Sequence, residues 1–302
     1  MDVRQMSALL AVADKGSFSA AARVLYTVQS NVSAHISRLE KEVGCILIDR
    51  SRGGLTAEGA LVAARARRIM AELDAVAADL AFHRGQVAGT IRCGSIGTTA
   101  RWLMPQLLPV FGERHPAVGV QIVEATTLSL IDQIAEGRLE LAILNLPVDD
   151  NELHSVELFA EDLFVVVNSS HPLSGRMSIS ITDLADQDLL LPPPGTALRI
   201  DMDEAAARAG VRLRGIAEID GGRLLTSLAM EGFGVAVTPA TAVPGWLKGD
   251  FRRIPMTGLN RRRVGLVNRR RSTLSAAARA FTETLYDVLD TRGRRQPGVH
   301  VH

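Results

Sequence analysis

The chain has 302 residues, of which 47% are hydrophobic, and its formal net charge is +1. This length predicts two or three domains, and the hydrophobic content is high enough for buried cores, which excludes a largely disordered chain. The near-zero net charge excludes a polycation, so a nucleic-acid site must be a local patch of basic side chains.

The cysteine content and the N-terminal residues indicate the compartment. The two cysteines, Cys45 and Cys93, form no CxxC motif, so a disulfide framework is not expected and a reducing environment fits. The N-terminus is too polar for a signal peptide, and no window of about 18 residues lacks charged and polar breaks. We therefore expect a cytoplasmic protein without membrane contact.

The first 43 residues predict a helix-turn-helix. A first helix covers about residues 3–13 and ends at Gly16. Ser17 is a good N-cap for a second helix, residues 26–28 make a tight turn, and a third helix begins near Gln29. The second helix of such a motif enters the major groove of DNA. DNA binding is therefore the first hypothesis.

The third helix has an apolar and a polar side. Its apolar residues recur at helical spacing and are expected to point inward: Val32, Ile36, Leu39 and Val43. The other side carries short or basic side chains that allow close approach to a groove floor: Ser30, Ser33, Ala34, Ser37 and Arg38. An ordinary serine-rich surface helix has the same pattern, but the preceding GSFSAAARVL and the following basic segment favour a recognition helix.

Basic residues gather in two places. The first group flanks the helix-turn-helix and can neutralise phosphates: Arg38, Lys41, Arg50, Arg52, Arg65, Arg67 and Arg68. In this stretch the RSRGG between Ile48 and Leu55 predicts a two-stranded wing. The second group consists of residues 261–263 and 269–271. An ordinary solvent-exposed face would have the same composition, so this group alone does not predict a nucleic-acid site.

A long helix is predicted after Thr56. Its apolar residues are spaced 4, 3, 4, 3 and 4 along the chain, the a/d seam of a coiled coil over about 20 residues. They are Val62, Ala66, Ile69, Leu73, Val76 and Leu80. Packing against the protein's own body would use the same residues, but the strict seam and charged flanks favour a second copy. Such a dimer reads a two-fold DNA site.

Gly85 and Gly89 mark a hinge, after which strands and helices alternate to about residue 290. This alternation predicts α/β subdomains with largely parallel sheets. Crossings between two lobes are expected near Glu161–Asp162 and near Arg263–Leu266. Two lobes crossed twice leave a cleft, and such clefts bind small molecules.

Loops at the carboxyl ends of strands are the candidate ligand site, because open α/β sheets bind ligands there. Four such loops contain small or hydroxyl residues whose N–H and O–H groups suit an anion: Ser95, Gly97, Thr98 and Thr99; Thr126; Asn145; and Pro193, Gly195 and Thr196. Each residue alone also suits a helix cap or turn. We group them as one candidate site because all of them follow the carboxyl ends of strands.

Signals for catalysis or metal binding are weak. The seven histidines are scattered, and the sequence has no HExxH, GxSxG or P-loop motif. Gly232-Phe233-Gly234 precedes a strand, so it is not a dinucleotide fingerprint. We expect no enzyme activity, no cofactor and no metal, and we expect Cys93 in the core.

The sequence resembles the LysR-type transcriptional regulators over about residues 2–290. The specific part is GSFSAAARVL, QSNVSAHISRLE, LIDR and LTAEG, while LMPQLLPVFGERHP and GFGVAVTP match more loosely. The resemblance implies an all-α winged helix-turn-helix with a long dimerising linker helix, followed by a two-lobed α/β, periplasmic-binding-protein-like effector domain. It also implies homotetramers and small-molecule co-inducers.

The resemblance also implies residue roles in DNA binding. It assigns base-edge contacts to Gln29, Ser30 and Ser33, a phosphate contact to Arg38, and wing contacts to Arg50 and Arg52. Three features depart from the family pattern, and two of them concern the DNA-contacting surface. Ala34 stands where many relatives carry a basic or long polar residue, and alanine makes only apolar contacts, such as with a thymine methyl. The wing is about two residues shorter than usual.

A third departure is Val28, which replaces a small hydroxyl residue in the turn and assigns the helix cap to Thr27. The predicted divisions are a DNA-binding domain at residues 1–59, a linker helix at 60–88 and an effector domain at 89–302. Lobe I is expected at about 89–162 and 266–302, and lobe II at about 163–265.

The expected function is a sequence-specific DNA-binding transcription regulator, dimeric through its linker, with a small carboxylate or other anion as co-inducer between the lobes. Two alternatives stand beside it. A transport-type solute receptor explains residues 89–290 but not the helix-turn-helix. An enzyme with an added DNA-binding domain needs a catalytic constellation that the sequence does not display.

Overall fold

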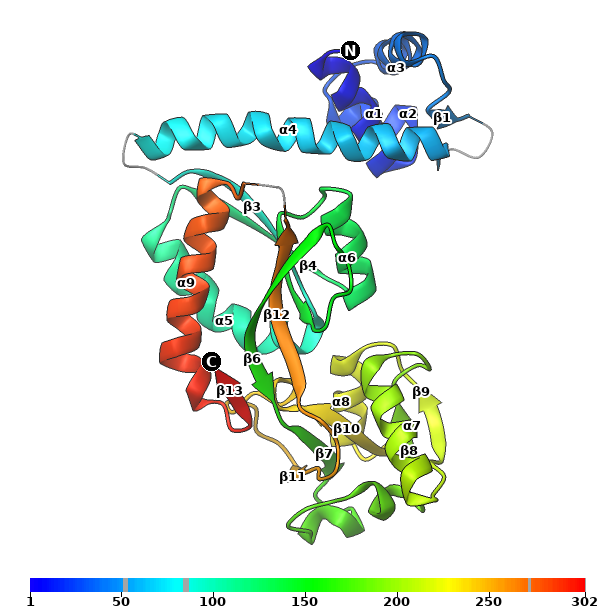
Figure 1. Ribbon diagram of the computed structural model, residues 1–302, viewed down its shortest axis with the longest axis vertical. Coiled ribbons are helices and arrows are strands. Elements are labelled where there is room, and N and C mark those ends of the chain that lie inside the picture. Colours follow the sequence, from blue (N-terminus) through cyan, green and yellow to red (C-terminus); the bar gives the residue numbers. More distant parts are fainter. Residues whose placement is uncertain (51–53, 84–86, 271–272, 302) are drawn as a thin grey trace.

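The computed structural model describes residues 1–50, 54–83, 87–270 and 273–301. Figure 1 shows three parts along the longest axis of the molecule: a helical domain with a long helix at one end, and two α/β lobes below it. These parts are the ones that the predicted fold class contains.

The helical domain is a three-helix unit whose ends are fixed by local capping. It contains α1 (Val3–Lys15), α2 (Phe18–Val24) and α3 (Gln29–Val43). Asp2 and Gln5 form a capping box at the start of α1, and Gly16 ends it in the left-handed conformation, with φ 70°. Leu9, Ile36 and Leu39 form the centre of its core and are fully buried.

A short wing connects this unit to the long helix. Strands β1 (Ile48–Asp49) and β2 (Gly54–Leu55) pair in antiparallel fashion, and α4 (Ala57–His83) follows. Gly59 permits the close approach of α4 to the wing, because a Cβ at this position would lie 1.9 Å from the carbonyl oxygen of Leu47. The wing and the start of α4 therefore form one packed unit with the helix-turn-helix.

Lobe I is built on a six-stranded sheet of order β13-β6-β12-β5-β3-β4. Helices α5 and α9 lie together on one side of it, and α6 lies on the other (Figure 1). Its elements are β3 (Gly89–Ser95), α5 (Gly97–Arg114), β4 (Val118–Glu124), α6 (Thr127–Ala135), β5 (Leu141–Asn145), β6 (Leu153–Glu161), β12 (Arg262–Arg269), α9 (Ala276–Arg292), η4 (Gly293–Arg295) and β13 (Val299–Val301).

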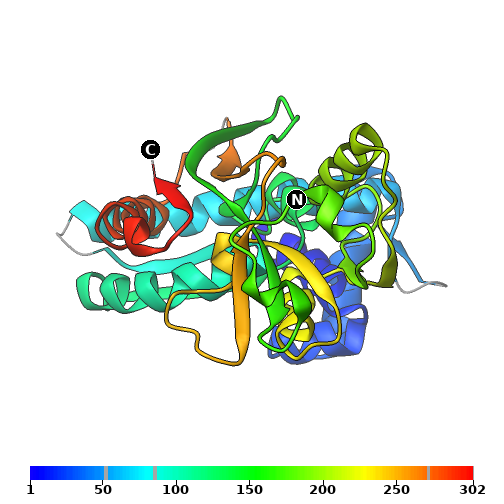
Figure 2. The same ribbon diagram turned by 90° about the horizontal axis from the view of Figure 1, so that it is seen from below.

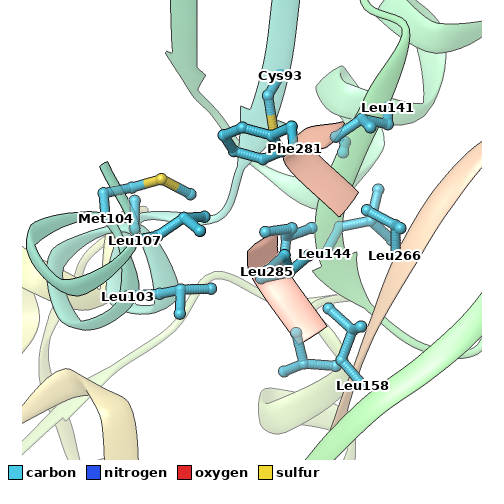
Figure 3. Close-up of a cluster of buried hydrophobic side chains, with 14 of the residues drawn as sticks. Cys93, Leu103, Met104, Leu107, Leu141, Leu144, Leu158, Leu266, Phe281 and Leu285 are labelled. Carbon is cyan, nitrogen blue, oxygen red and sulfur yellow. The ribbon is translucent and has the colours of Figure 1, made fainter. Parts of the chain in front are cut away.

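The core of lobe I lies between its helices and its sheet. In Figure 3, Phe281 and Leu285 of α9 lie between Leu107 of α5 and the side chains of Leu144 and Leu266 on the strands. Cys93 is part of this core and is 0% exposed, as predicted.

Lobe II is built on a five-stranded sheet of order β11-β7-β10-β8-β9. Its core is formed by buried aliphatic side chains such as Val165, Leu189 and Val237. Its elements are β7 (Leu163–Asn168), η1 (Pro172–Gly175), η2 (Ile181–Leu184), β8 (Leu189–Leu191), α7 (Ala197–Ala209), β9 (Gly215–Glu218), α8 (Gly222–Met230), β10 (Val235–Pro239), η3 (Ala240–Ala242) and β11 (Phe251–Pro255).

The prediction of largely parallel sheets is wrong, because both sheets are mixed. Parallel pairing is found between β3 and its neighbours β4 and β5, and between β8 and its neighbours β9 and β10. The chain leaves lobe I along β6 and β7 and returns along β11 and β12. These two crossing segments run in opposite directions, so β6 pairs antiparallel with β12 and β7 with β11.

The return crossing also lies earlier than predicted. Strand β12 already begins at Arg262, so the crossing precedes Arg263–Leu266. The C-terminal segment after α9 adds β13 to the edge strand β6, a strand that the sequence did not predict. The side chain of Gln296 donates to the carbonyls of Ala240 and Val243 in lobe II, so this segment joins both lobes.

Helix α9 packs across α4. In Figure 1 α9 is vertical and α4 horizontal, and in Figure 2 α9 is seen nearly end-on while α4 runs horizontally behind it. A second link between α4 and lobe I is the hydrogen bond from Arg68 Nη2 to the carbonyl of Ala135, at 2.8 Å. Arg67 forms an ion pair with Asp14 of α1. The first half of α4 therefore contacts both the helix-turn-helix and the effector lobe. Among the described residues, no helix is long and apolar enough to cross a membrane.

Candidate functional site

The recognition helix α3 exposes the side that was predicted to meet DNA. Its inner residues Val32, Ile36 and Leu39 are each 0% exposed, although Val43 at its end is 38% exposed rather than buried. The outer residues are exposed, apart from the half-buried Ser33: Gln29, Ser30, Ala34, Ser37 and Arg38. The N-terminal end of α3 is exposed, since Val28, Gln29 and Ser30 are all exposed to solvent, and α3 lies at the end of the molecule away from the two lobes (Figure 1).

The N-terminus of α3 has no side-chain cap. Its N-cap residue is Val28, and no side chain of the described residues accepts from its first N–H groups. The hydroxyl of Thr27 instead accepts a hydrogen bond from Asn31 Nδ2 at 3.0 Å, so the assignment of Thr27 as the cap is wrong. Uncapped N–H groups at a helix N-terminus favour an anion such as a phosphate.

Contacts within the domain hold several of the predicted DNA-binding side chains in place. Gln29 Oε1 accepts from Ser19 Oγ at 2.7 Å. Arg50 Nη2 donates to Ser37 Oγ at 3.2 Å, and its guanidinium lies 5.7 Å from the ring centroid of Phe18. The wing cation is thus held beside α3. Arg52 lies outside the described residues.

The predicted seam of α4 divides into a covered and an uncovered part. Val62 is half-buried against the chain's own helical domain, and Ala66 is buried. Ile69, Leu73 and Val76 are 39%, 48% and 58% exposed, an apolar row of the kind that a partner helix covers. The side chain of Leu80 lies outside the described residues.

The predicted ligand loops of lobe I meet at one edge of its sheet. Ser95, at the end of β3, lies opposite Glu124 of β4 and Ile143 of β5 in the register. Thr126 caps α6 by accepting from the backbone N–H of Ser129, and the Ser95 hydroxyl donates to the carbonyl of Ile96. These two hydroxyls therefore have partners within the chain.

Two buried polar atoms at this edge lack a partner. Thr99 Oγ1 and Asn145 Oδ1 are inaccessible to solvent and form no hydrogen bond among the described residues. Helix α5 begins beside them, and no side chain of the described residues caps its N-terminus. Because buried polar atoms in native proteins nearly always form hydrogen bonds, this combination indicates a place for a polar ligand or an ordered water.

A buried ion pair lies where the two lobes join. Arg262 Nε donates to Oε1 of Glu161 at 2.7 Å, and the Glu161 side chain is 0% exposed. The same guanidinium donates to the hydroxyls of Thr98 at 2.9 Å and Thr241 at 3.2 Å. The backbone N–H of Thr241 donates to Glu161 Oε2. Arg262 thus ties the predicted ligand loop to the hinge, a role that the arginine cluster did not reveal.

A second ion pair joins the two lobes. Arg223, in the first turn of α8 in lobe II, lies 3.0 Å from Glu124 Oε1 at the end of β4 in lobe I. The helices α5 and α8 approach closely at their N-termini, since a Cβ on Gly222 would lie 2.9 Å from Thr98 Cγ2. The Glu124 carboxylate also lies against Gly97. A carboxylate of the chain itself therefore lies at the start of α5.

The hinge residue Asp162 has four partners, and its backbone carbonyl accepts from the N–H of Ala240 at 3.0 Å. Its backbone N–H donates to the carbonyl of Gly298, and its carboxylate binds Arg261 Nε at 2.7 Å and His300 Nε2 at 3.0 Å. Partial burial opposes ionisation of this carboxyl, but its hydrogen bonds to His300 and Arg261 outweigh burial and lower its pKa.

The predicted residues of lobe II form a turn of their own. Thr196 Oγ1 donates to the carbonyl of Pro193 at 2.9 Å, and Gly195 has φ 83°, a left-handed value that glycine adopts without strain. Contact of these residues with a ligand stays a prediction. No group of three or more His, Cys, Asp or Glu side chains that could hold a metal ion is found among the described residues.

A winged helix-turn-helix, joined by a long helix to a two-lobed α/β domain, defines a DNA-binding transcription regulator with an effector-binding domain. The model for bacterial regulatory helix-turn-helix proteins of the lysR family matches residues 3–60, and the LysR substrate binding domain matches residues 84–290. The chain therefore belongs to the LysR family of transcriptional regulators.

Similar proteins include regulators of the peroxide response. A probable hydrogen peroxide-inducible genes activator of Mycobacterium leprae is 31% identical over 295 residues, covering 95% of this chain and 94% of that protein. A full-length OxyR variant from Pseudomonas aeruginosa has a TM-score of 0.75 at 24% identity, covering 96% and 95% of the two chains.

CbnR in complex with its target DNA has a TM-score of 0.68 at 22% identity, covering 95% of this chain and 100% of that one. At these identities the two structures support the fold.

Proposed function

We propose that this regulator binds a small carboxylate or another small anion between its lobes, and that binding changes the spacing of paired DNA-binding domains. The observation that carries the proposal is the uncapped start of α5, beside the partnerless Thr99 hydroxyl and the Arg262 guanidinium. Helix N-termini and guanidinium groups both favour anions. The residues proposed as ligand contacts are Gly97, Thr98, Thr99, Thr126 and Asn145 of lobe I and Pro193, Gly195 and Thr196 of lobe II, with Ser95 shaping the loop.

The charged residues between the lobes suit an anionic ligand that competes with the Glu124 carboxylate for Arg223. The Glu124 carboxylate lies beside Gly97 and pairs with Arg223. Both side chains are partly exposed, at 50% for Arg223 and 38% for Glu124, so their pairing is weak. An anion at the start of α5 replaces Glu124 as the partner of Arg223 and thereby holds the two lobes together.

The mechanism is a population shift. A ligand that binds one arrangement of the lobes more tightly increases the population of that arrangement. Lobe I transmits the change through Arg68, which donates to the carbonyl of Ala135 at the end of α6, and through α9, which lies across α4. Two chains joined through α4, and four in the proposed homotetramer, then change the distance between their recognition helices.

Thr99→Val tests the ligand site. Because the Thr99 hydroxyl is buried without a partner, an apolar group of the same shape should keep or raise the melting temperature without ligand. The same change should reduce the ligand-induced rise in melting temperature, because a ligand that binds only the native state stabilises it. The measurement is a thermal-shift titration with small carboxylates and aromatic acids.

Ser170→Ala is a control for Thr99→Val, because this exposed hydroxyl lies in lobe II and bonds only its neighbour Asn168 among the described residues. It should leave the ligand response unchanged. A full ligand response in the Thr99 variant would exclude this hydroxyl from the site.

Peroxide sensing, which the names of similar proteins raise, requires an accessible thiolate. Of the chain's two cysteines, Cys93 is 0% exposed, and burial raises the pKa of its thiol. Cys45 lies in the helical domain, half-buried. The effector domain therefore offers no reactive thiol, which favours reversible ligand binding.

We expect hydrogen peroxide to leave the operator affinity of the protein unchanged, and the Cys45→Ser, Cys93→Ala double variant to respond to the anionic ligand like the parent. Gel-shift titrations with and without peroxide, and mass spectrometry of both cysteines, check this. A peroxide-dependent affinity that the double variant loses would favour a thiol sensor instead.

A further inference from the structure

The turn of the helix-turn-helix contains a tyrosine in a position that normally requires glycine. Helix α2 ends in a Schellman motif: the N–H of Tyr26 donates to the carbonyl of Arg23 at 3.3 Å, and the N–H of Thr27 donates to the carbonyl of Ala22 at 3.0 Å. This motif places Tyr26 in the left-handed conformation, with φ 51°. It is the only residue besides glycine with a positive φ in the described part of the chain.

The protein gains nothing from this side chain within the subunit. A left-handed conformation strains any residue that has a Cβ, and Gly16 and Gly44 occupy the corresponding positions after α1 and α3. The Tyr26 side chain is 98% exposed, so neither packing nor a hydrogen bond within the described chain offsets the strain. Strained residues that the fold does not need are candidates for function.

The position of Tyr26 indicates what it meets. It lies three residues before Gln29, the first residue of α3, where the chain is exposed. Val28 beside it is 59% exposed and Arg23 is exposed as well. When the N-terminal residues of a recognition helix reach base edges, the turn before that helix lies over the adjoining sugar-phosphate ridge.

We propose that Tyr26 is a DNA-backbone contact that positions α3 in the groove. Its hydroxyl donates to a phosphate oxygen at the edge of each half-site, and its ring covers the neighbouring deoxyribose together with Val28. Tyrosine hydroxyls are among the groups that bind phosphate and fix the register of a protein on a duplex. The proposal rests on the binding of DNA through α3.

The Tyr26 phenol is neutral, so its contribution to DNA affinity can be distinguished from that of a basic residue by its dependence on salt. Each phosphate neutralised by an arginine or lysine releases a counterion and steepens the dependence of affinity on salt. Removal of a neutral donor lowers affinity at every salt concentration and leaves the slope unchanged. A control variant, Arg38→Ala, should reduce the slope by about one unit.

The test uses the full chain and a labelled duplex that the unaltered protein selects from a random-sequence pool. Tyr26→Gly relieves the backbone strain, so its melting temperature should equal or exceed that of the parent, while its affinity should fall by about tenfold or more. Tyr26→Phe keeps the ring and the strain but loses the hydroxyl, and it should show a smaller loss of affinity. Both should keep the salt slope of the parent.

The outcomes separate this proposal from the one on which it rests. A Tyr26→Gly protein that binds the duplex as tightly as the parent would overturn the role of Tyr26 alone. A loss of affinity accompanied by a lower melting temperature would also overturn it, because the residue would then serve the fold. If Gln29→Ala leaves both affinity and sequence preference unchanged, the placement of α3 in the groove fails as well.

Discussion

Leu73→Asp in α4 is expected to halve the sedimentation mass of the protein and to abolish tight operator binding. Leu73 lies in the middle of the exposed row of Ile69, Leu73 and Val76. In a paired helix its side chain would be buried, and a carboxylate there would lose its hydration without gaining a cation. Within the isolated subunit it is 48% exposed, so the change should leave the subunit folded.

The loss of DNA affinity should be large because the Leu73 change reduces the number of linked recognition helices. Two linked recognition helices bind a two-fold site with an avidity that exceeds the affinity of one helix by about 10²–10⁴-fold. Separated subunits lose this factor, although each α3 keeps its own contacts. Gel-shift titration at fixed salt measures the loss, and circular dichroism checks that the helices remain.

Leu61→Asp is the matched control for Leu73→Asp. Leu61 lies on the same helix and is 63% exposed, but it precedes the seam residue Val62 and is not part of the a/d pattern. The same chemical change at this position should leave mass and operator affinity unchanged. If the Leu73 variant also sediments like the parent, α4 is not the dimer interface.

The sequence predicted the helices and strands of this fold better than it predicted which strands pair. Periodicity marked α3 through Val32, Ile36 and Leu39 and marked the strands by their apolar runs, because each pattern is local. It did not show that β6 and β12 run in opposite directions, since strand pairing depends on where the chain crosses between lobes. The β13 strand was missed because Val299–Val301 is too short for periodicity to detect.

In the candidate site, too, the residues that follow from local patterns were predicted and those that depend on long-range contacts were not. Small residues at strand ends, such as Thr98 and Asn145, were found because their position follows from the strand pattern. Arg262 was missed among three consecutive arginines, Arg261 to Arg263. A signal was available: side chains alternate along a strand, and Arg262 shares its side with the buried Val264. Tyr26 gave no signal at all, because a left-handed turn without glycine cannot be recognised from the sequence.

The Arg262–Glu161 pair gives the second large expected effect. Arg262→Met leaves the Glu161 carboxylate buried, at 0% exposure, without its cation. Removal of one partner from a buried ion pair costs about 3–5 kcal/mol, which in a domain of this size lowers the melting temperature by roughly 6–20 °C. A thermal melt followed by circular dichroism measures this.

The adjacent Arg263→Met is the control for this prediction. Arg263 lies next in the chain and also pairs with a carboxylate, Glu157, but its side chain is 55% exposed. Surface pairs contribute about 0–1 kcal/mol, so this variant should melt within about 4 °C of the parent. An equal loss in both variants would show that the burial of Glu161 does not determine the effect.

The double variant Glu161→Gln, Arg262→Met separates stability from ligand response. It has no buried charge, and the amide oxygen of the introduced glutamine would still accept from the N–H of Thr241, so most of the lost stability should return. Thr98 remains without the guanidinium that now donates to its hydroxyl. We therefore expect a stable protein whose melting temperature responds weakly to the anionic ligand. A restored response would mean that the hinge pair supports the fold alone, and that the ligand loop does not depend on Arg262.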